Sequence, residues 1–201
     1  MSLRYLALGD SYTIGEDVLA DQRWPVQLVE KLRRHSMLID DPQIVAATGW
    51  TTDELSDGMD KAELGASYDL VTLLIGVNNQ YRGRPAEEYR MQFRTLLMRA
   101  MALAGKHPKR VVVISIPDWG VTPFGHKSSR DRRQIATELD TFNTIARMEA
   151  LEAGARFVNI TGISRDHADL VASDGLHPSG AQYTLWTDAI EPAVTEALGH
   201  P

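Results

Sequence analysis

Ser11 has the sequence context of a catalytic nucleophile. It lies in Gly9-Asp10-Ser11-Tyr12, directly after the apolar run at residues 3–8. A serine between a buried strand and a turn or helix is held at the rim of a sheet, and its backbone N–H can point to the same space as its hydroxyl. Taken alone, Gly-Asp-Ser is more often an ordinary turn or helix cap, so a catalytic role for Ser11 depends on whether other residues of a catalytic site are present.

The segment Asp174-Gly175-Leu176-His177 could supply the base that a serine nucleophile needs. Histidine accepts the hydroxyl proton and returns it to the leaving group. A carboxylate on the other ring nitrogen holds the histidine in the right tautomer. An aspartate three residues before a histidine, with a glycine turn between them, can fold back to that nitrogen. In isolation, a helix cap beside a surface histidine is the more common explanation.

Asn78 and Gly49 could stabilise the oxyanion that acyl transfer creates. This tetrahedral oxyanion requires preorganised N–H donors. The side-chain amide of Asn78, in Gly76-Val77-Asn78-Asn79, could be one donor, and the backbone N–H groups of Ser11 and Gly49 could be the others. A turn residue for Asn78 and a loop hinge for Gly49 are the alternatives when each is taken singly.

The elements that must position these residues follow from hydrophobic periodicity. Short apolar runs lie at residues 3–8, 43–47, 70–75, 111–116 and 156–160, and helical patterns at about 25–37, after 52, and at about 85–105, 129–152 and 178–198. Continuous apolar runs are typical of parallel strands covered on both faces. We expect an α/β fold, a three-layer αβα sandwich with a five-stranded parallel sheet in the flavodoxin-like order 2-1-3-4-5. Without a linker or repeat, residues 1–201 are expected to form a single domain.

The candidate residues converge on one rim of such a sheet, because ligands bind outside the carboxyl ends of parallel strands. Ser11, Gly49 and Asn78 follow the first three predicted strands, and Asp174 and His177 lie between the fifth strand and the last helix, which we expect to start at Pro178. Each element alone favours the ordinary structural explanation. Their joint occurrence in this order favours a shared site.

The combined pattern resembles that of the SGNH hydrolases, also called G-D-S-L lipases and esterases. The motif positions of that family correspond here to Ser11, Gly49, Gly76, Asn78, Asp174 and His177. The resemblance implies the SGNH hydrolase fold and a serine esterase with a Ser-His-Asp triad and an acyl-enzyme intermediate, which requires no metal or cofactor. Tyr12 and Asn79 depart from the leucine and aspartate usual in the family, and neither change removes a catalytic atom.

Several aromatic residues could line a substrate pocket. Trp119, Phe124 and His126 lie in the segment after the fourth predicted strand, and Tyr81 follows Asn78 closely. Packing of these side chains on the domain itself is the alternative. The loops are short and leave little room for a long acyl tunnel, so we expect a preference for short acyl chains.

Composition limits the partners and the location. The 201 residues carry a net charge of -6 and contain no cysteine. An acidic surface argues against nucleic acid or an anionic membrane as the main partner, and we expect a small-molecule ester instead. The absence of cysteine excludes disulfides, thiolate catalysis and Cys-based zinc sites. No apolar run reaches the ~18 residues of a membrane span, and residues 3–8 do not form a signal peptide, so we expect a cytoplasmic protein.

Other functions remain open at this point. A non-enzymatic nucleotide- or flavin-binding module could use the same flavodoxin-like topology, although the segment after the first strand lacks a glycine-rich phosphate cradle. Within ester chemistry, carbohydrate acetylesterase, thioesterase and lysophospholipid hydrolase activities use the same catalytic groups.

Overall fold

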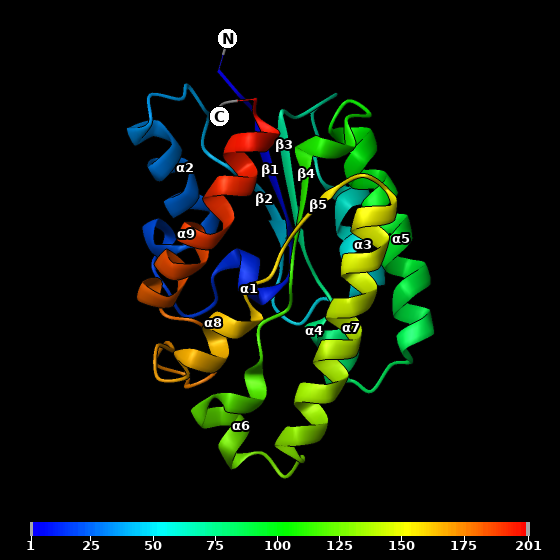
Figure 1. Ribbon diagram of the computed structural model, residues 1–201, viewed down its shortest axis with the longest axis vertical. Helices are drawn as coiled ribbons and strands as arrows, with labels where there is room; N and C mark the ends of the chain where they lie inside the picture. The colour runs from blue at the N-terminus through cyan, green and yellow to red at the C-terminus, as the bar shows by residue number, and fades with distance from the viewer. Residues whose placement is uncertain (1, 200–201) are drawn as a thin grey trace.

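Five short parallel strands form the centre of the computed structural model, which describes residues 2–199 (Figure 1). The strands are β1 (Tyr5–Gly9), β2 (Gln43–Ala46), β3 (Leu70–Leu74), β4 (Val111–Ile114) and β5 (Arg156–Val158). Their order is β2-β1-β3-β4-β5, and every neighbouring pair is parallel. The predicted α/β fold class and strand order are therefore confirmed.

The register of the sheet aligns the carboxyl ends of its first three strands. Gly9 at the end of β1 pairs with Ala46 of β2 on one side and with Leu74 of β3 on the other. Every residue of β1, β3 and β4 is buried, which explains their continuous apolar sequences. The segments that follow β1, β2 and β3 consequently start next to one another at one edge of the sheet.

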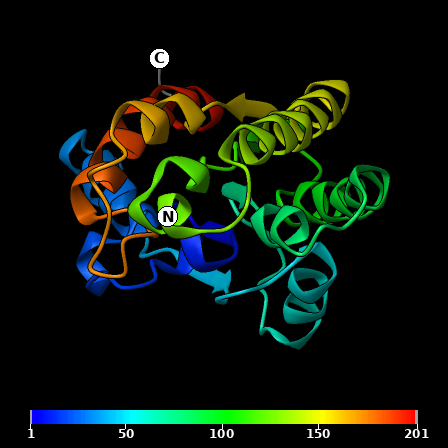
Figure 2. The ribbon, with the colours of Figure 1, turned by 90° about the horizontal axis from the view of Figure 1, so that it is seen from below.

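Long helices cover both faces of the sheet (Figures 1 and 2). One face carries α2 (Trp24–Arg34) and α9 (Gly180–Ala197), and the other carries α3 (Thr52–Lys61), α5 (Ala86–Leu103) and α7 (Arg132–Glu152). Trp24 and Trp186 are fully buried in the first helical layer. In the second layer, Tyr89 of α5 stacks on Phe142 of α7 with ring centroids 4.5 Å apart. This is the three-layer αβα arrangement.

Short helices at the carboxyl edge of the sheet shape the loops there. They are α1 (Ser11–Ile14), α4 (Val77–Tyr81), α6 (Pro123–Lys127) and α8 (Thr161–Asp166), with 3-10 turns at Ala20–Gln22 and Trp119–Val121. A further 3-10 turn, Pro108–Arg110, directly precedes β4 at the opposite edge. Segments of three to six residues are too short to show a helical period in the sequence. The last helix also begins later than Pro178: Ser179 is its N-cap and accepts a hydrogen bond from the backbone N–H of Gln182 at 3.4 Å.

Candidate active site

Ser11 is the first residue of α1 and comes two residues after the end of β1. It is 5% exposed and lines a pocket at the carboxyl edge of the sheet. Asp10 caps α1 by accepting a hydrogen bond from the backbone N–H of Tyr12 at 3.1 Å. Within residues 2–199, the backbone N–H of Ser11 donates to no other group, as is usual at a helix start. The serine thus offers both a hydroxyl and a free N–H.

Asp10 itself is buried behind this turn rather than in the pocket. Burial raises the pKa of Asp10 from 3.8 to about 7, while hydrogen bonds from the backbone N–H groups of Tyr12 and Gly76 oppose the shift. Its Oδ2 atom has no hydrogen-bond partner among the described residues. The carboxyl group of Asp10 therefore stabilises the turn before α1 through its hydrogen bond with Tyr12, and burial disfavours its charged form.

Asp174 and His177 form a tight local pair. Asp174 Oδ2 lies 2.5 Å from His177 Nδ1. The other oxygen, Oδ1, accepts hydrogen bonds from the backbone N–H groups of Leu176 at 2.8 Å and His177 at 3.0 Å. Burial raises the pKa of Asp174, but the hydrogen bonds lower it by a larger amount. The net pKa therefore lies below its usual value. The carboxylate therefore remains ionised while it orients the imidazole ring.

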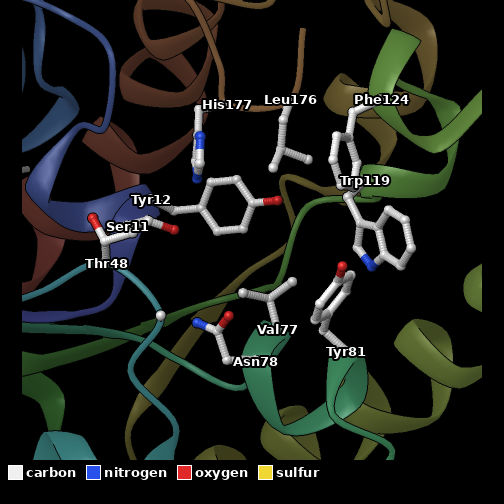
Figure 3. A pocket seen from close by; sticks show the side chains of 11 residues that line it. Ser11, Tyr12, Thr48, Val77, Asn78, Tyr81, Trp119, Phe124, Leu176 and His177 are labelled. Carbon is white, nitrogen blue, oxygen red and sulfur yellow. The ribbon is translucent and has the colours of Figure 1, made fainter. Parts of the chain in front are cut away.

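The ring of His177 faces the same pocket as Ser11 (Figure 3). Because Nδ1 is engaged by Asp174, the nitrogen left for the pocket is Nε2. His177 is 8% exposed, so little solvent reaches its ring. The arrangement is that of a base whose tautomer is set by a carboxylate, as the Asp-x-x-His spacing predicts.

Gly49 and its neighbours form the second side of the pocket. Gly49 has φ +84°, a conformation that favours glycine, whereas a Cβ atom there would approach no atom closer than Arg82 Nη2 at 3.8 Å. Glycine is thus required here by backbone conformation and not by lack of space. Arg82 donates from Nη2 to the Gly49 carbonyl at 2.7 Å and pairs with Glu54 at 3.2 Å. These contacts hold the peptide while the N–H of Gly49 has no partner within residues 2–199.

Asn78 lies in α4 and lines the same pocket as Gly49. Its Nδ2 donates to the carbonyl of Trp50 at 2.9 Å. An amide nitrogen carries two hydrogens, so the second is available to the pocket. Gly76 precedes this short helix with φ +130°, and a Cβ atom there would lie 2.5 Å from Tyr89 Cε2. The glycine therefore allows the turn before α4 to approach Tyr89 of α5 closely, and α4 then brings Asn78 to the site.

Asn79 is a structural residue. Its Oδ1 accepts from the backbone N–H of Thr52 at 3.1 Å, and its Nδ2 donates to the Thr52 hydroxyl at 2.7 Å. Thr52 is the first residue of α3, so Asn79 anchors the start of that helix. Asn79 does not line the pocket, although it differs from the aspartate usual in the family.

The pocket has a volume of about 230 Å³ (Figure 3). Besides the polar groups just described, it is lined by Tyr12, Thr48, Val77, Tyr81, Trp119, Phe124 and Leu176. Trp119 is 2% exposed, and its Nε1 donates to Gln80 Oε1 at 2.9 Å. Tyr81 and Phe124 are 51% and 37% exposed and flank Trp119. The pocket thus has a buried apolar inner wall and an open aromatic rim.

The structure brings together most of the residues selected from the sequence, but not His126. That residue is exposed at the end of α6, and its Nε2 lies 2.7 Å from Arg132 Nη1. Sequence reasoning missed Tyr12, Thr48, Val77 and Leu176 as lining residues. Their positions in the sequence could have indicated them, because each directly precedes or follows a motif residue.

Comparison with known proteins decides the family. A model of the GDSL-like lipase/acylhydrolase family matches residues 7–185. The chain belongs to that family. Membership makes it an enzyme that hydrolyses ester bonds, and the motif-based resemblance is confirmed. No curated protein is detectably similar to this chain in sequence.

Solved structures confirm the fold of this GDSL-family enzyme. A psychrotrophic esterase from Pseudoalteromonas sp. is 17% identical with a TM-score of 0.72, covering 99% of this chain and 100% of the other. An acetylxylan esterase from Geobacillus stearothermophilus is 17% identical with a TM-score of 0.71, covering 99% and 95%. A lipase/acylhydrolase from Enterococcus faecalis is 21% identical with a TM-score of 0.69, covering 99% and 96%. At these identities the likeness concerns the fold.

Two further features of residues 2–199 complete the description. No three acidic or histidine side chains gather there in a metal-binding cluster. Asp166, His167 and Asp169, which lie close together in sequence at and just after the end of α8, form no such cluster either. None of the described helices combines the length and apolar character needed to cross a membrane.

Proposed function

We propose that this enzyme hydrolyses esters of short carboxylic acids through a serine nucleophile. Ser11 attacks, His177 transfers the proton, Asp174 orients His177, and the N–H groups of Ser11, Gly49 and Asn78 bind the oxyanion. The observation that carries the proposal is the single pocket that Ser11, Gly49, Asn78 and His177 share, with the carboxylate of Asp174 2.5 Å behind the histidine ring. Such a set of groups is recognised by its geometry and roles.

The reaction takes two steps. His177 Nε2 accepts the Ser11 proton as Ser11 Oγ bonds to the ester carbonyl carbon, and the tetrahedral oxyanion then collapses with loss of the alcohol, which takes the proton from His177. Water next attacks the acyl-enzyme with His177 as base, and the carboxylic acid and free Ser11 are released. The oxyanion donors act in both steps, and each such donor typically contributes about 2.7–4 kcal/mol.

The pocket supports a short acyl group. Its volume of about 230 Å³ is below the ~300–1,000 Å³ of sites that enclose drug-sized ligands. The acyl group stays bound to Ser11 after the alcohol leaves, so it belongs in the buried part of the pocket near Tyr12, Val77 and Trp119, which are 3%, 6% and 2% exposed. The alcohol leaves past the open rim at Tyr81 and Phe124.

The decisive experiment compares the protein with Ser11→Ala on p-nitrophenyl esters of increasing acyl length. We expect the wild type to hydrolyse the acetate and butanoate esters fastest and Ser11→Ala to fall to background. Ser67→Ala is the matched control, because Ser67 is exposed and precedes β3 at the opposite edge of the sheet. Equal rates for wild type and Ser11→Ala would overturn the proposed nucleophile, and faster cleavage of ~C8–C12 esters than of acetate would overturn the proposed acyl length.

A further inference from the structure

Tyr12 presents its hydroxyl to the pocket. The residue is 3% exposed, and within residues 2–199 its hydroxyl forms no hydrogen bond. In Figure 3 the ring extends from the Ser11 side of the pocket, and the hydroxyl points toward the side lined by Leu176 and Trp119. A substrate that fills the pocket displaces water from this hydroxyl, so the hydroxyl then requires a hydrogen-bond acceptor on the substrate.

The position of the Tyr12 ring is fixed by its packing. The ring makes an edge contact with His177 at a centroid distance of 5.6 Å and a tilted contact with Trp186 at 6.2 Å. Tyr183 donates its hydroxyl hydrogen to the Tyr12 carbonyl at 3.0 Å. The hydroxyl is therefore preorganised and cannot swing out to solvent without disrupting the contact with His177.

The surroundings of Tyr12 select the kind of partner. Burial raises the pKa of Tyr12, and the nearby carboxyl group of Asp174 raises it further, so the phenol stays protonated and can donate. Asp174 stays ionised, and its negative charge disfavours a carboxylate in this recess. Val77, Trp119 and Leu176 supply the apolar remainder of the wall. A neutral oxygen on a short, otherwise apolar chain fits these conditions.

We infer that Tyr12 is a specificity residue that donates a hydrogen bond to a neutral oxygen of the acyl group. The preferred substrates are then esters of short acids that carry a hydroxyl, keto or ether oxygen, in preference to plain alkanoic esters. This inference rests on the proposed esterase function and on acyl binding in the buried part of the pocket.

The test uses p-nitrophenyl esters that differ by one oxygen in place of a methylene: methoxyacetate against butanoate, and 3-methoxypropanoate against pentanoate. For each pair the ratio of kcat/KM values is measured in wild type and in Tyr12→Phe. Dividing the two ratios cancels the intrinsic reactivity of the esters. We expect the wild-type ratio to exceed the Tyr12→Phe ratio about 2- to 12-fold in at least one pair, as for one hydrogen bond.

The outcomes separate this inference from the proposed function. Hydrolysis of all four esters with equal ratios in both proteins overturns the role of Tyr12 and leaves the esterase intact. A wild type that hydrolyses none of them overturns both. Tyr12→Phe keeps the ring that packs on His177 and Trp186. If it fails to fold, Tyr12→Leu carries the same comparison.

A separate observation concerns Asp17, which connects the nucleophile segment to the acid-base loop. Asp17 Oδ2 accepts hydrogen bonds from the Ser173 hydroxyl at 2.5 Å and from the backbone N–H of Asp174 at 2.9 Å. Asp17 also has φ +60°, a left-handed conformation that is unfavourable for a residue other than glycine. The neighbouring Glu16 accepts a hydrogen bond from the hydroxyl of Thr48, next to Gly49.

We propose that Asp17 is a positioning residue that holds Asp174, and through it His177, in register with Ser11. The segment just after α1 thereby sets the distance between nucleophile and base. The strained conformation is retained because it directs the carboxylate at Ser173 and Asp174, as expected where strain serves a site. This inference rests on the proposed triad but not on the identity of the substrate.

Asp17→Gly tests the role, because it relieves the left-handed strain while it removes both hydrogen bonds. We expect an unchanged or higher melting temperature together with a kcat on p-nitrophenyl acetate lower by about tenfold to a hundredfold, as for a small misplacement of catalytic groups. Asp17→Asn, which keeps an acceptor oxygen, should restore most of kcat. Ser36→Gly is the matched control, since Ser36 also has a positive φ of 63° but lies after α2, away from the pocket.

A readout independent of activity is the downfield proton resonance of the His177 Nδ1–H···Asp174 hydrogen bond. It should shift or broaden in Asp17→Gly and persist in Asp17→Asn and Ser36→Gly. Wild-type kcat and an unchanged resonance in Asp17→Gly would overturn the positioning role. A perturbed resonance in Asp17→Gly, with no esterase activity in any protein, would support the positioning contact and overturn the proposed function alone.

Discussion

Replacing Asp174 by asparagine exchanges one carboxylate oxygen for an NH₂ group and should remove the base function of His177. In the native turn, Oδ1 accepts the backbone N–H groups of Leu176 and His177, and Oδ2 faces His177 Nδ1 at 2.5 Å. An asparagine that keeps the backbone bonds directs its NH₂ group at Nδ1. The ring must then carry its proton on Nε2, the nitrogen that should accept the Ser11 proton. We expect kcat to fall by about 10⁴-fold, equivalent to about 5.4 kcal/mol of transition-state stabilisation.

Stability distinguishes this effect from local unfolding. Asp174→Ala loses both backbone hydrogen bonds as well, and we expect it to lower the free energy of unfolding by about 1–3 kcal/mol. Asp174→Asn keeps them and should unfold close to wild type. Asp169→Asn is the control, because Asp169 is an exposed aspartate in the same loop.

The assay measures initial rates on p-nitrophenyl acetate near neutral pH, with urea unfolding of each variant. An Asp174→Asn protein that kept more than about a tenth of wild-type kcat would refute the tautomer argument. Loss of activity that followed the loss of stability across the variants, Asn included, would show that Asp174 acts through the fold.

Three further changes test other parts of the site. Because the pKa of Asp10 is raised from 3.8 to about 7, the folded protein holds a proton that the unfolded chain releases, so stability declines as pH rises between these values. Asp10→Asn should therefore gain in urea midpoint over wild type at pH above about 7 but not at pH near 4, and an equal difference at both pH values would contradict the shift. Gly49→Ala, at φ +84°, should lower kcat by about 10²–10³-fold if the peptide turns its N–H away from the oxyanion, and unchanged kcat would remove Gly49 as a donor. Leu176→Ala widens the apolar wall of the pocket, so the preferred acyl chain should lengthen by about one or two methylenes in a chain-length series, and an unchanged profile would place the acyl group elsewhere.

The sequence predicts the sheet well because burial on both faces leaves a strong pattern. The residues of β1, β3 and β4 are continuous apolar runs and are completely buried. The topology places Ser11 and Asn78, which follow β1 and β3, at one edge of the sheet. Gly49 follows the neighbouring, less buried strand β2, and all three residues line one pocket.

Side-chain direction in the loops could not be predicted, because tertiary contacts determine it. Phe124 lies on the pocket rim, whereas His126, two residues later on the same short helix, pairs with Arg132. Tyr12 follows Ser11 in the sequence, but its ring reaches the pocket because it packs against His177 and Trp186. Contacts between segments that lie far apart in sequence leave no local periodicity to detect.

The acid-base loop shows why sheet topology alone is insufficient to assemble the site. Asp174 and His177 are separated from the end of β5 by α8 and a further segment, so the sheet does not deliver them directly. The chain returns through a local antiparallel bridge between Val171 and Pro178, in which Ala172 donates to the His177 carbonyl at 2.7 Å. The hydrogen bond from Asp174 N–H to Asp17 then joins this turn to the nucleophile segment. Three strand ends place the proposed nucleophile and oxyanion donors, whereas a small independent turn places the proposed base. Changes at the Asp17 contact should therefore alter turnover while the sheet and its helices stay intact.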